Sequence, residues 1–226
     1  GALPILIEAL TDALVVTPAA IRLAPESGLR RYRGLSDDAN EPGFLLVRAP
    51  LSTSEVLIKR AMDLVIASLA LVLLVPVLAV VAALIKLDSA GPALFRQTRH
   101  GFNQSTFRVF KFRTMRVMED GAAFTQATRG DTRVTRIGYW LRRTNIDELP
   151  QILNVLTGDM SIVGRRPHPV ALNDAFDSRI AHYSRRHVVR PGITGWAQVH
   201  GLRGETDTED KMRARVAYDL AYLKNW

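Results

Sequence analysis

The chain has 226 residues, of which 47% are hydrophobic and 23% are charged, and it contains no cysteine. This composition is that of a chain that buries a core, and it excludes a disulfide framework and a thiolate metal site. The formal net charge of +8 favours anionic partners, which leaves nucleic acid, an acidic membrane surface and phosphorylated small molecules as alternatives.

Residues 1–50 are divided into short pieces by breakers such as Pro18, Pro25 and Pro42. Pieces of this length are too short to close a core of their own. We therefore predict that residues 1–50 are a linker or the tail fragment of an N-terminal domain.

The 22 residues from Leu64 to Ile85 carry no charge, and a helix of about that length crosses the hydrocarbon core of a membrane. The alternative is a buried helix of a soluble core, but such a long soluble helix usually has a polar face. Pro76 favours a kink in the middle, and basic residues flank both ends, which favours a cytoplasmic position for both. We predict a broken, re-entrant helical hairpin over residues 51–88 rather than a single span.

Residues 89–118 contain six Lys or Arg and no Asp or Glu. Apolar and basic residues alternate from Phe107 to Arg113, which predicts a β-strand with a basic edge. This stretch suits either an interfacial segment on anionic headgroups or a phosphate-binding wall at the membrane surface. No HExxH-type, Walker A or GxGxxG spacing occurs, so a zinc site, a P-loop and a dinucleotide fold have no support.

Two helices are predicted next, the first beginning near residue 137 and the second covering residues 146–156, with Gly158 placed to end it. Asp147 and Glu148 therefore open the second helix. Such a pair is most often a cap. Here arginines crowd around it, and carboxylates with arginines are what a site for a diphosphate and its counter-ion requires.

Four segments, in this order and spacing, resemble the bacterial sugar transferase family of monotopic phosphoglycosyl transferases. They are the apolar stretch that begins KRAMDLVIASLALVLL, then FRVFKFRTM, LRRTNIDELPQILNVLTGDMSIVGRRP and RPGITGWAQVHG. The resemblance runs from about Lys59 to Trp226. It implies a mostly helical α+β fold, with the re-entrant helix in the bacterial inner membrane and a catalytic domain at residues 89–226 that carries a small β element on the cytoplasmic face.

The family resemblance also implies the reaction. A hexose-1-phosphate passes from a UDP-sugar to undecaprenyl phosphate, UMP is released, and Mg²⁺ takes part, as the first membrane step of exopolysaccharide or capsule synthesis. Asp147 would be the nucleophile, ionised by a low pKa at the helix N-terminus, and would carry a covalent phosphosugar; Glu148 would bind Mg²⁺ or activate the incoming group. The implied substrate-binding residues are Lys111, Arg113, Arg142, Arg166 and Arg190, and the implied Mg²⁺ ligands are Asp147 and Glu148.

The segment GETDT at residues 204–208 resembles the glucose-1-phosphate subgroup of the family. Galactose or an N-acetyl sugar, a hydrolase of lipid phosphates and a basic, membrane-anchored scaffold without turnover remain as alternatives. Inner-membrane lipids and a second copy of the chain are expected partners, and nucleic acid is not. Arg165 stands where the family usually has proline, which puts the local geometry of the GRRP turn in doubt.

Overall fold

A computed structural model gives the fold. It describes the backbone of residues 21–23 and 44–47, and the backbone and side chains of residues 51–116, 131–180, 183–204 and 208–225. Most of the predicted linker or domain tail at residues 1–50 lies outside these residues; its described part is an antiparallel pair, β1 (Ile21–Leu23) and β2 (Phe44–Val47). The domain boundaries at residues 50 and 88 stay predictions. The described chain is mostly helical with a small β element, as predicted.

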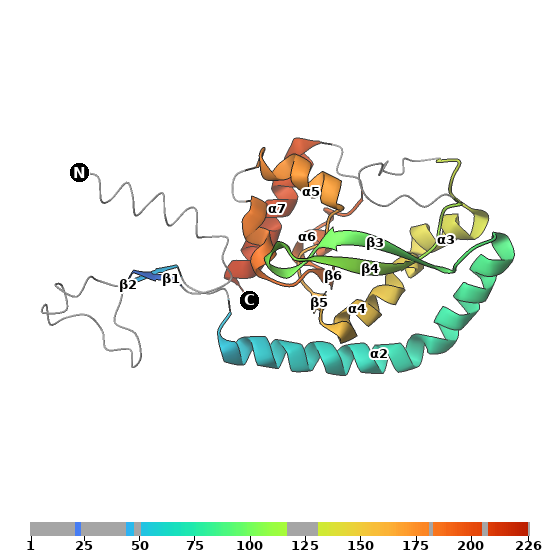
Figure 1. Ribbon diagram of the computed structural model, residues 1–226, viewed down its shortest axis with the longest axis horizontal. Coiled ribbons are helices and arrows are strands. Elements are labelled where there is room, and N and C mark those ends of the chain that lie inside the picture. Colours follow the sequence, from blue (N-terminus) through green and yellow to red (C-terminus); the bar gives the residue numbers. More distant parts are fainter. Residues whose placement is uncertain are drawn as a thin grey trace, which may run out of the picture.

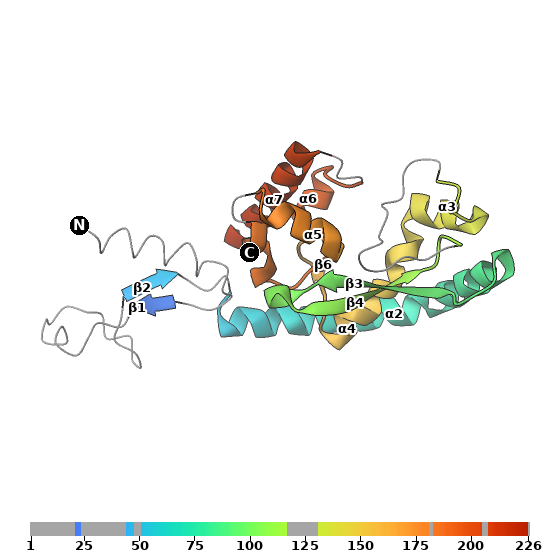
Figure 2. The ribbon, with the colours of Figure 1, turned by 45° about the horizontal axis from the view of Figure 1, so that its top comes forward.

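The longest element is the 36-residue helix α2 (Thr53–Asp88). Ser52 begins it as a capping box with Glu55, in which each residue binds the backbone N–H of the other. The predicted break at Pro76 is wrong, because the helix continues through this residue. A proline removes only one intrahelical hydrogen bond and can be accommodated by bending, and Figures 1 and 2 show α2 as one bent helix along the edge of the domain.

One face of α2 packs on the rest of the protein, and the opposite face is apolar and exposed. Ala67, Val81 and Ile85 are buried at helical spacing. Only 11% of the most apolar stretch of α2 is buried, and by length and composition the helix could cross a membrane. The large exposed side chains of α2 include Leu57, Ile58, Met62, Val65, Leu69, Val72, Leu73, Val80, Leu84 and Leu87.

The predicted strand is confirmed as β4 (Thr106–Phe112), which pairs antiparallel with β3 (Leu94–His100). In this hairpin Gln97 lies opposite Val109, and Arg99 lies opposite Phe107. Since side chains alternate along a strand, Gln97, Arg99 and Val109 share one face, and all three are buried.

The Asp-Glu pair follows the helix α3 (Arg136–Thr144), which ends at Asn145 in the left-handed conformation (φ 61°). The chain then forms a 3₁₀ helix, η3 (Ile146–Gln151), that continues as α4 (Ile152–Thr157). The predicted second helix is therefore 3₁₀ in its first part and α-helical in its second. Gly158, with φ 96°, ends α4 as predicted.

The main core lies between α2, the β3–β4 hairpin and α4 (Figure 1). Its buried members are Ala67, Val109, Ile152, Val155 and Met160. Polar bonds fasten the first part of α2 to the same layer. Arg60 donates to the carbonyls of Val155 and Leu156 at 2.6 and 2.9 Å, and the Asp63 carboxylate accepts from the Ile162 N–H at 3.0 Å.

The far end of α2 is fastened to the same domain as its beginning. Val81 and Ile85 pack with Phe112 and with α3, and the Asp88 carboxylate accepts from the first turn of α3 at 3.2 Å. The Arg113 guanidinium donates to the carbonyls of Ile85, Ser89 and Ala90 at the C-terminus of the helix. Such a cation stabilises the exposed carbonyl end of a helix.

The remaining elements are η2 (Phe102–Gln104), β5 (Ser161–Val163), α5 (Val170–Asp177), η4 (Tyr183–Val188), β6 (Gly192–Thr194), α6 (Trp196–Val199) and α7 (Glu209–Lys224). Figure 2 shows α5, α6 and α7 on the side of the hairpin away from α2. The strands β5 and β6 are parallel. They approach so closely that a Cβ on Gly195 would meet the Gly164 carbonyl oxygen at 2.1 Å.

A buried polar cluster joins these elements. Arg186 and Asp219 form an ion pair at 2.5 Å with side chains 0% and 2% exposed. Arg186 also donates to His168 Nδ1 at 2.7 Å. Nearby, Arg165 donates to His187 Nδ1 at 2.8 Å and to the carbonyls of the β3–β4 turn. Arg165 therefore ties the GRRP turn to the hairpin, which proline at this position cannot do.

We predict that acid destabilises the fold through His168 and His187. Burial, with the charges of Arg165 and Arg186, lowers the pKa of His187 to about 2, and burial beside Arg186 lowers the pKa of His168 well below 6.5. Both imidazoles stay neutral in the folded state but bind protons once unfolded, so stability is present above pH 6.5 and is lost as the pH falls below it. Between pH 7.5 and 5.5 the loss is about 1.4 kcal/mol for each imidazole.

Melting curves of the protein in nanodiscs between pH 7.5 and 5.5 measure this loss. The control is His200→Gln, on an exposed ring, which should keep the pH dependence. A melting temperature that stays constant down to pH 5.5 would contradict the prediction.

Candidate active site

Glu148 is the centre of a cluster of three charged residues. It lies in the first turn of η3 and is 9% exposed. Lys111 of β4 donates to its Oε1 at 2.9 Å, and Arg166, after β5, donates to its two oxygens at 2.6 and 3.0 Å. Burial alone would raise the pKa of Glu148, but the two cations outweigh burial and hold the pKa well below its usual range. Glu148 is therefore ionised and keeps both cations in place.

Asp147 precedes Glu148 but has a different environment. None of the hydrogen bonds within the described residues reaches its carboxylate. Burial raises the pKa of Asp147, Lys111 opposes the rise, and Glu148 adds to it. The predicted low pKa is wrong, because desolvation outweighs the N–H groups of one short 3₁₀ turn. A desolvated carboxylate without a hydrogen-bonded partner is suited to attack an electrophile.

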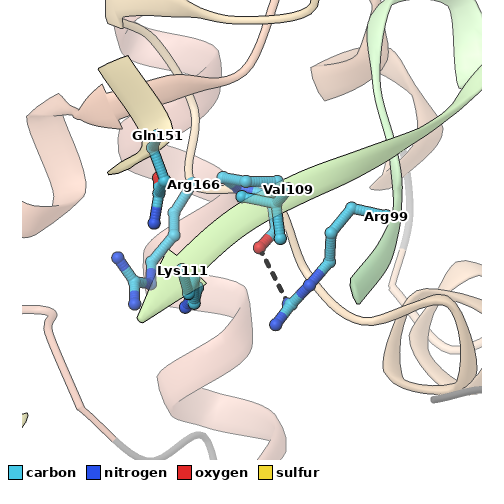
Figure 3. A pocket seen from close by; sticks show the side chains of 6 residues that line it. Arg99, Val109, Lys111, Gln151 and Arg166 are labelled. Atoms are coloured by element: carbon cyan, nitrogen blue, oxygen red, sulfur yellow. Dashed lines mark hydrogen bonds between the residues drawn. The ribbon is translucent and has the colours of Figure 1, made fainter. Parts of the chain in front are cut away.

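A small cavity of about 20 Å³ adjoins this cluster. Figure 3 shows that Arg99, Lys111 and Arg166 converge on it, and that Arg99 is held by a hydrogen bond; Arg99 donates to the Pro167 carbonyl at 3.1 Å. Val109, Gln151 and Pro167 complete the lining. Three cations around so small a space can bind phosphate oxygens.

A second cavity, of about 270 Å³, also reaches Glu148. Its walls come from η3 and the residue that precedes it, from β6, from α6 and from the segment after α6. They are formed by Asn145, Glu148, Leu149, Ile193, Thr194, Gln198, Val199 and Arg203. The Glu148 cluster is thus the border that the two cavities share.

The structure brings together four of the predicted site residues: Asp147, Glu148, Lys111 and Arg166. The predicted Arg142 lies exposed in the last turn of α3, close enough that its charge lowers the pKa of Asp147 against the larger effect of burial. We therefore keep Arg142 as a candidate for binding the substrate.

Arg113 and Arg190 are not among the residues that line these two cavities, so their role in binding the substrate stays a prediction. Arg113 is 3% exposed and holds the C-terminus of α2. It follows the last residue of β4, so its side chain leaves the face that carries Lys111. Arg190 exerts its charge on Lys59, near the start of α2.

Sequence reasoning missed Arg99, Gln198 and Arg203. The strand register places Arg99 on the face of Gln97 and Val109. A predicted pairing of the two strands would therefore have identified Arg99 as a candidate. Gln198 and Arg203 come close to Glu148 only through the β5–β6 contact. No signal in a single sequence predicts that contact.

Two carboxylates are available for Mg²⁺. Among the described residues no group of three or more His, Asp or Glu side chains is arranged to hold a metal ion. Mg²⁺ usually takes one or two carboxylates from the protein and the remaining ligands from phosphates and water. Asp147 and Glu148 fit this pattern, provided that a bound phosphate supplies further oxygens.

Comparisons with known proteins match this chain to one family. A family model described as bacterial sugar transferase matches residues 54–226. A UDP-glucose:undecaprenyl-phosphate glucose-1-phosphate transferase of Escherichia coli is 55% identical over 82% of this chain and 40% of the relative. A protein of the same name from Caulobacter vibrioides is 54% identical over 74% of this chain and 63% of the relative.

Another relative is named for a different sugar. A UDP-N-acetylgalactosamine-undecaprenyl-phosphate N-acetylgalactosaminephosphotransferase of Aeromonas hydrophila is 46% identical over 75% of this chain and 40% of the relative. The chain therefore spans about two fifths of two of these three relatives and just under two thirds of the third.

Proposed function

Because the chain belongs to the bacterial sugar transferase family, we propose that it transfers a hexose-1-phosphate from a UDP-sugar to undecaprenyl phosphate and releases UMP. The observation that carries the proposal is the pair of unlike carboxylates. Glu148 is paired with Lys111 and Arg166, whereas Asp147 is desolvated and accepts no hydrogen bond within the described residues. A nucleophile beside a cationic phosphate surface is what a covalent transfer requires.

In this mechanism a carboxylate oxygen of Asp147 attacks the β-phosphorus of the donor. An oxygen–phosphorus bond forms, and the bond between the β-phosphorus and the bridging oxygen breaks, so that UMP leaves with the electron pair. An oxygen of undecaprenyl phosphate then attacks the phosphosugar and returns the carboxylate of Asp147. Each displacement concentrates negative charge, which Lys111 and Arg166 neutralise from fixed positions.

We propose Mg²⁺ as the cofactor, with Asp147 and Glu148 as its protein ligands. When bound, this ion neutralises charge on the diphosphate of the donor. Arg99, Lys111 and Arg166 lie around the small cavity, and we propose that these cations bind the diphosphate of the donor. Arg142 then adds charge from the exposed side of Asp147.

We propose that the sugar is glucose. We also propose that the reaction is the first membrane step of exopolysaccharide synthesis. The names of the Escherichia coli and Caulobacter relatives support glucose. The name of the Aeromonas relative keeps an N-acetyl sugar as the alternative. Residues 205–207, within the segment GETDT, lie outside the described residues.

The contacts of α2 support a re-entrant position in the inner membrane. Arg60 and Asp63 bind the layer of α4 and β5, and Asp88 binds α3 of the same domain. Both ends of α2 therefore contact the same domain, which supports a position of both ends on one side of the membrane. The exposed apolar face of α2 then lies in lipid, with the catalytic domain on the cytoplasmic face.

Cysteine labelling tests this topology on a chain that has no native cysteine. We predict that Ser54→Cys and Ala90→Cys, placed singly at the two ends of α2, both resist a membrane-impermeant thiol reagent in intact cells. Both should react after the membrane is permeabilised, since both positions are exposed. Labelling of only one of them from outside would establish a span.

The proposed reaction is tested by the release of UMP. The purified chain, in nanodiscs with Mg²⁺, is incubated with UDP-glucose, UDP-galactose or UDP-N-acetyl sugars, with and without undecaprenyl phosphate. We expect sustained release of UMP only when lipid phosphate is present, with the highest rate from UDP-glucose. Release of inorganic phosphate from the lipid alone would indicate a hydrolase, and no product at all would indicate a scaffold.

A further inference from the structure

The larger cavity beside Glu148 differs in chemistry from the cationic cavity. Polar groups of Asn145, Thr194, Gln198 and Arg203 face it from separate segments of the chain, and Leu149, Ile193 and Val199 add apolar surface. At about 270 Å³ it is slightly smaller than the usual site of a drug-sized ligand. It therefore suits a small polar molecule with hydrogen-bonding groups on several sides.

Gln198 lines this cavity and carries an unused acceptor beneath the cavity wall. Its Oε1 is buried and accepts no hydrogen bond from the described residues, and its Nε2 makes only a long bond of 3.4 Å to the Ile193 carbonyl. A buried acceptor without a donor costs free energy unless a ligand supplies the donor. The hydroxyl groups of a sugar are such donors.

The position of Gln198 relative to the catalytic cluster is fixed. Its backbone N–H donates to the Gly195 carbonyl at 2.9 Å, and Gly195 packs directly on Gly164, two residues before Arg166. The same contact that places Arg166 on Glu148 therefore places Gln198 at the cavity.

We propose that this cavity binds the hexose of the donor, with Gln198 and Arg203 as hydrogen-bonding residues that contribute to the choice of sugar. The inference rests on the proposed function and adds the site of the sugar. In that reaction the hexose is joined through one oxygen to the phosphorus that Asp147 attacks, so it must lie next to the Asp-Glu pair. The nucleoside is one phosphate further away, and the described residues that line the cavity include no aromatic ring on which uracil would stack.

The test compares ligands with and without the sugar. The full chain carries Asp147→Asn, so that bound donor is not consumed, and it is held in nanodiscs with Mg²⁺. Calorimetry measures the affinity for UDP-glucose, UDP and UMP. Gln198→Leu and Arg203→Met are each expected to lower the affinity for UDP-glucose about five- to ten-fold, which corresponds to the loss of one hydrogen bond. The affinities for UDP and UMP should change by less than about two-fold. The matched control is Arg213→Met, an exposed arginine of α7 paired with Glu209, which should change no affinity.

Two results would overturn the inference. If the affinities for UDP-glucose and UMP fell equally, the nucleoside would lie in this cavity. If the affinity for UDP-glucose did not change, the sugar would not bind there. A melting curve of each variant identifies a loss of fold. Failure of the proposed function is recognised separately, because the wild-type chain would then release no UMP from any donor.

Discussion

Asp147→Asn is expected to lower the release of UMP by at least about 1,000-fold and to abolish the covalent phosphosugar. An amide oxygen is a poor nucleophile and lacks the charge needed to form the acyl phosphate. Mass spectrometry of the wild-type chain with Mg²⁺ and UDP-glucose should show a protein heavier by one hexose phosphate, and the variant should show none.

The fold should tolerate this substitution. Burial raises the pKa of Asp147, so the ionised carboxylate opposes folding above the ordinary aspartate pKa, and the neutral amide removes that cost. The melting temperature is therefore expected to stay equal or to rise. The control is Asp174→Asn, on an exposed side chain of α5, which should keep full activity. Near-normal turnover by Asp147→Asn would exclude the covalent mechanism.

Asp219→Asn is expected to lower the free energy of unfolding by about 3–5 kcal/mol, the usual loss when one partner of a buried ion pair is removed. The charge of Asp219 acts on Arg165, Arg186 and Arg215, and all three arginines are buried. Without it, Arg186 loses its ion pair at 2.5 Å and remains buried.

The same substitution should also lower activity in the protein that is still folded. Arg186 donates to the Arg166 carbonyl at 2.9 Å, and Arg166 holds Glu148, so the loss of Asp219 loosens the site indirectly. Denaturant unfolding in nanodiscs measures the stability, with Asp210→Asn as the control at an exposed position of the same helix. An unfolding free energy within about 1 kcal/mol of wild type would show that the cluster does not depend on this carboxylate.

The proximity of Asp147, Glu148 and Arg166 could be predicted because these residues are close in sequence. Asp147, Glu148 and Arg166 lie within one segment of twenty residues, and its helical period, its glycine at residue 158 and its charges are all local signals. Lys111 was found through the family resemblance. The β-strand that presents it follows from alternation alone.

The position of Arg113 at the C-terminus of α2 depends on information that a sequence does not contain. Two positions after Lys111, Arg113 would share the face of Lys111 if the strand continued. The strand ends at Phe112, and Arg113 turns to the carbonyl end of α2 instead. Where a strand ends depends on what packs beyond it, here a helix that lies more than twenty residues earlier in the chain.

The buried polar cluster and the pKa of Asp147 depend on tertiary packing in the same way. Helix α7 buries Arg215 and Asp219 as well as Met212 and Val216, so an apolar stripe does not mark its inner face. Desolvation of Asp147 likewise depends on surrounding elements, whereas the rule for helix N-termini uses only neighbours in sequence.

The packing of α2 has a consequence for how this protein can be made. Ala67 of α2 completes the same apolar core as Ile152 and Val155, which follow Asp147 and Glu148 in the chain. Removing the helix would expose that core, so we expect the part of the chain after α2 to lose its fold when it is cut free of the helix. During biosynthesis the ribosome releases α2 before the strands and helices that pack on it, so Asp147 and Glu148 reach their positions against a helix that is already complete.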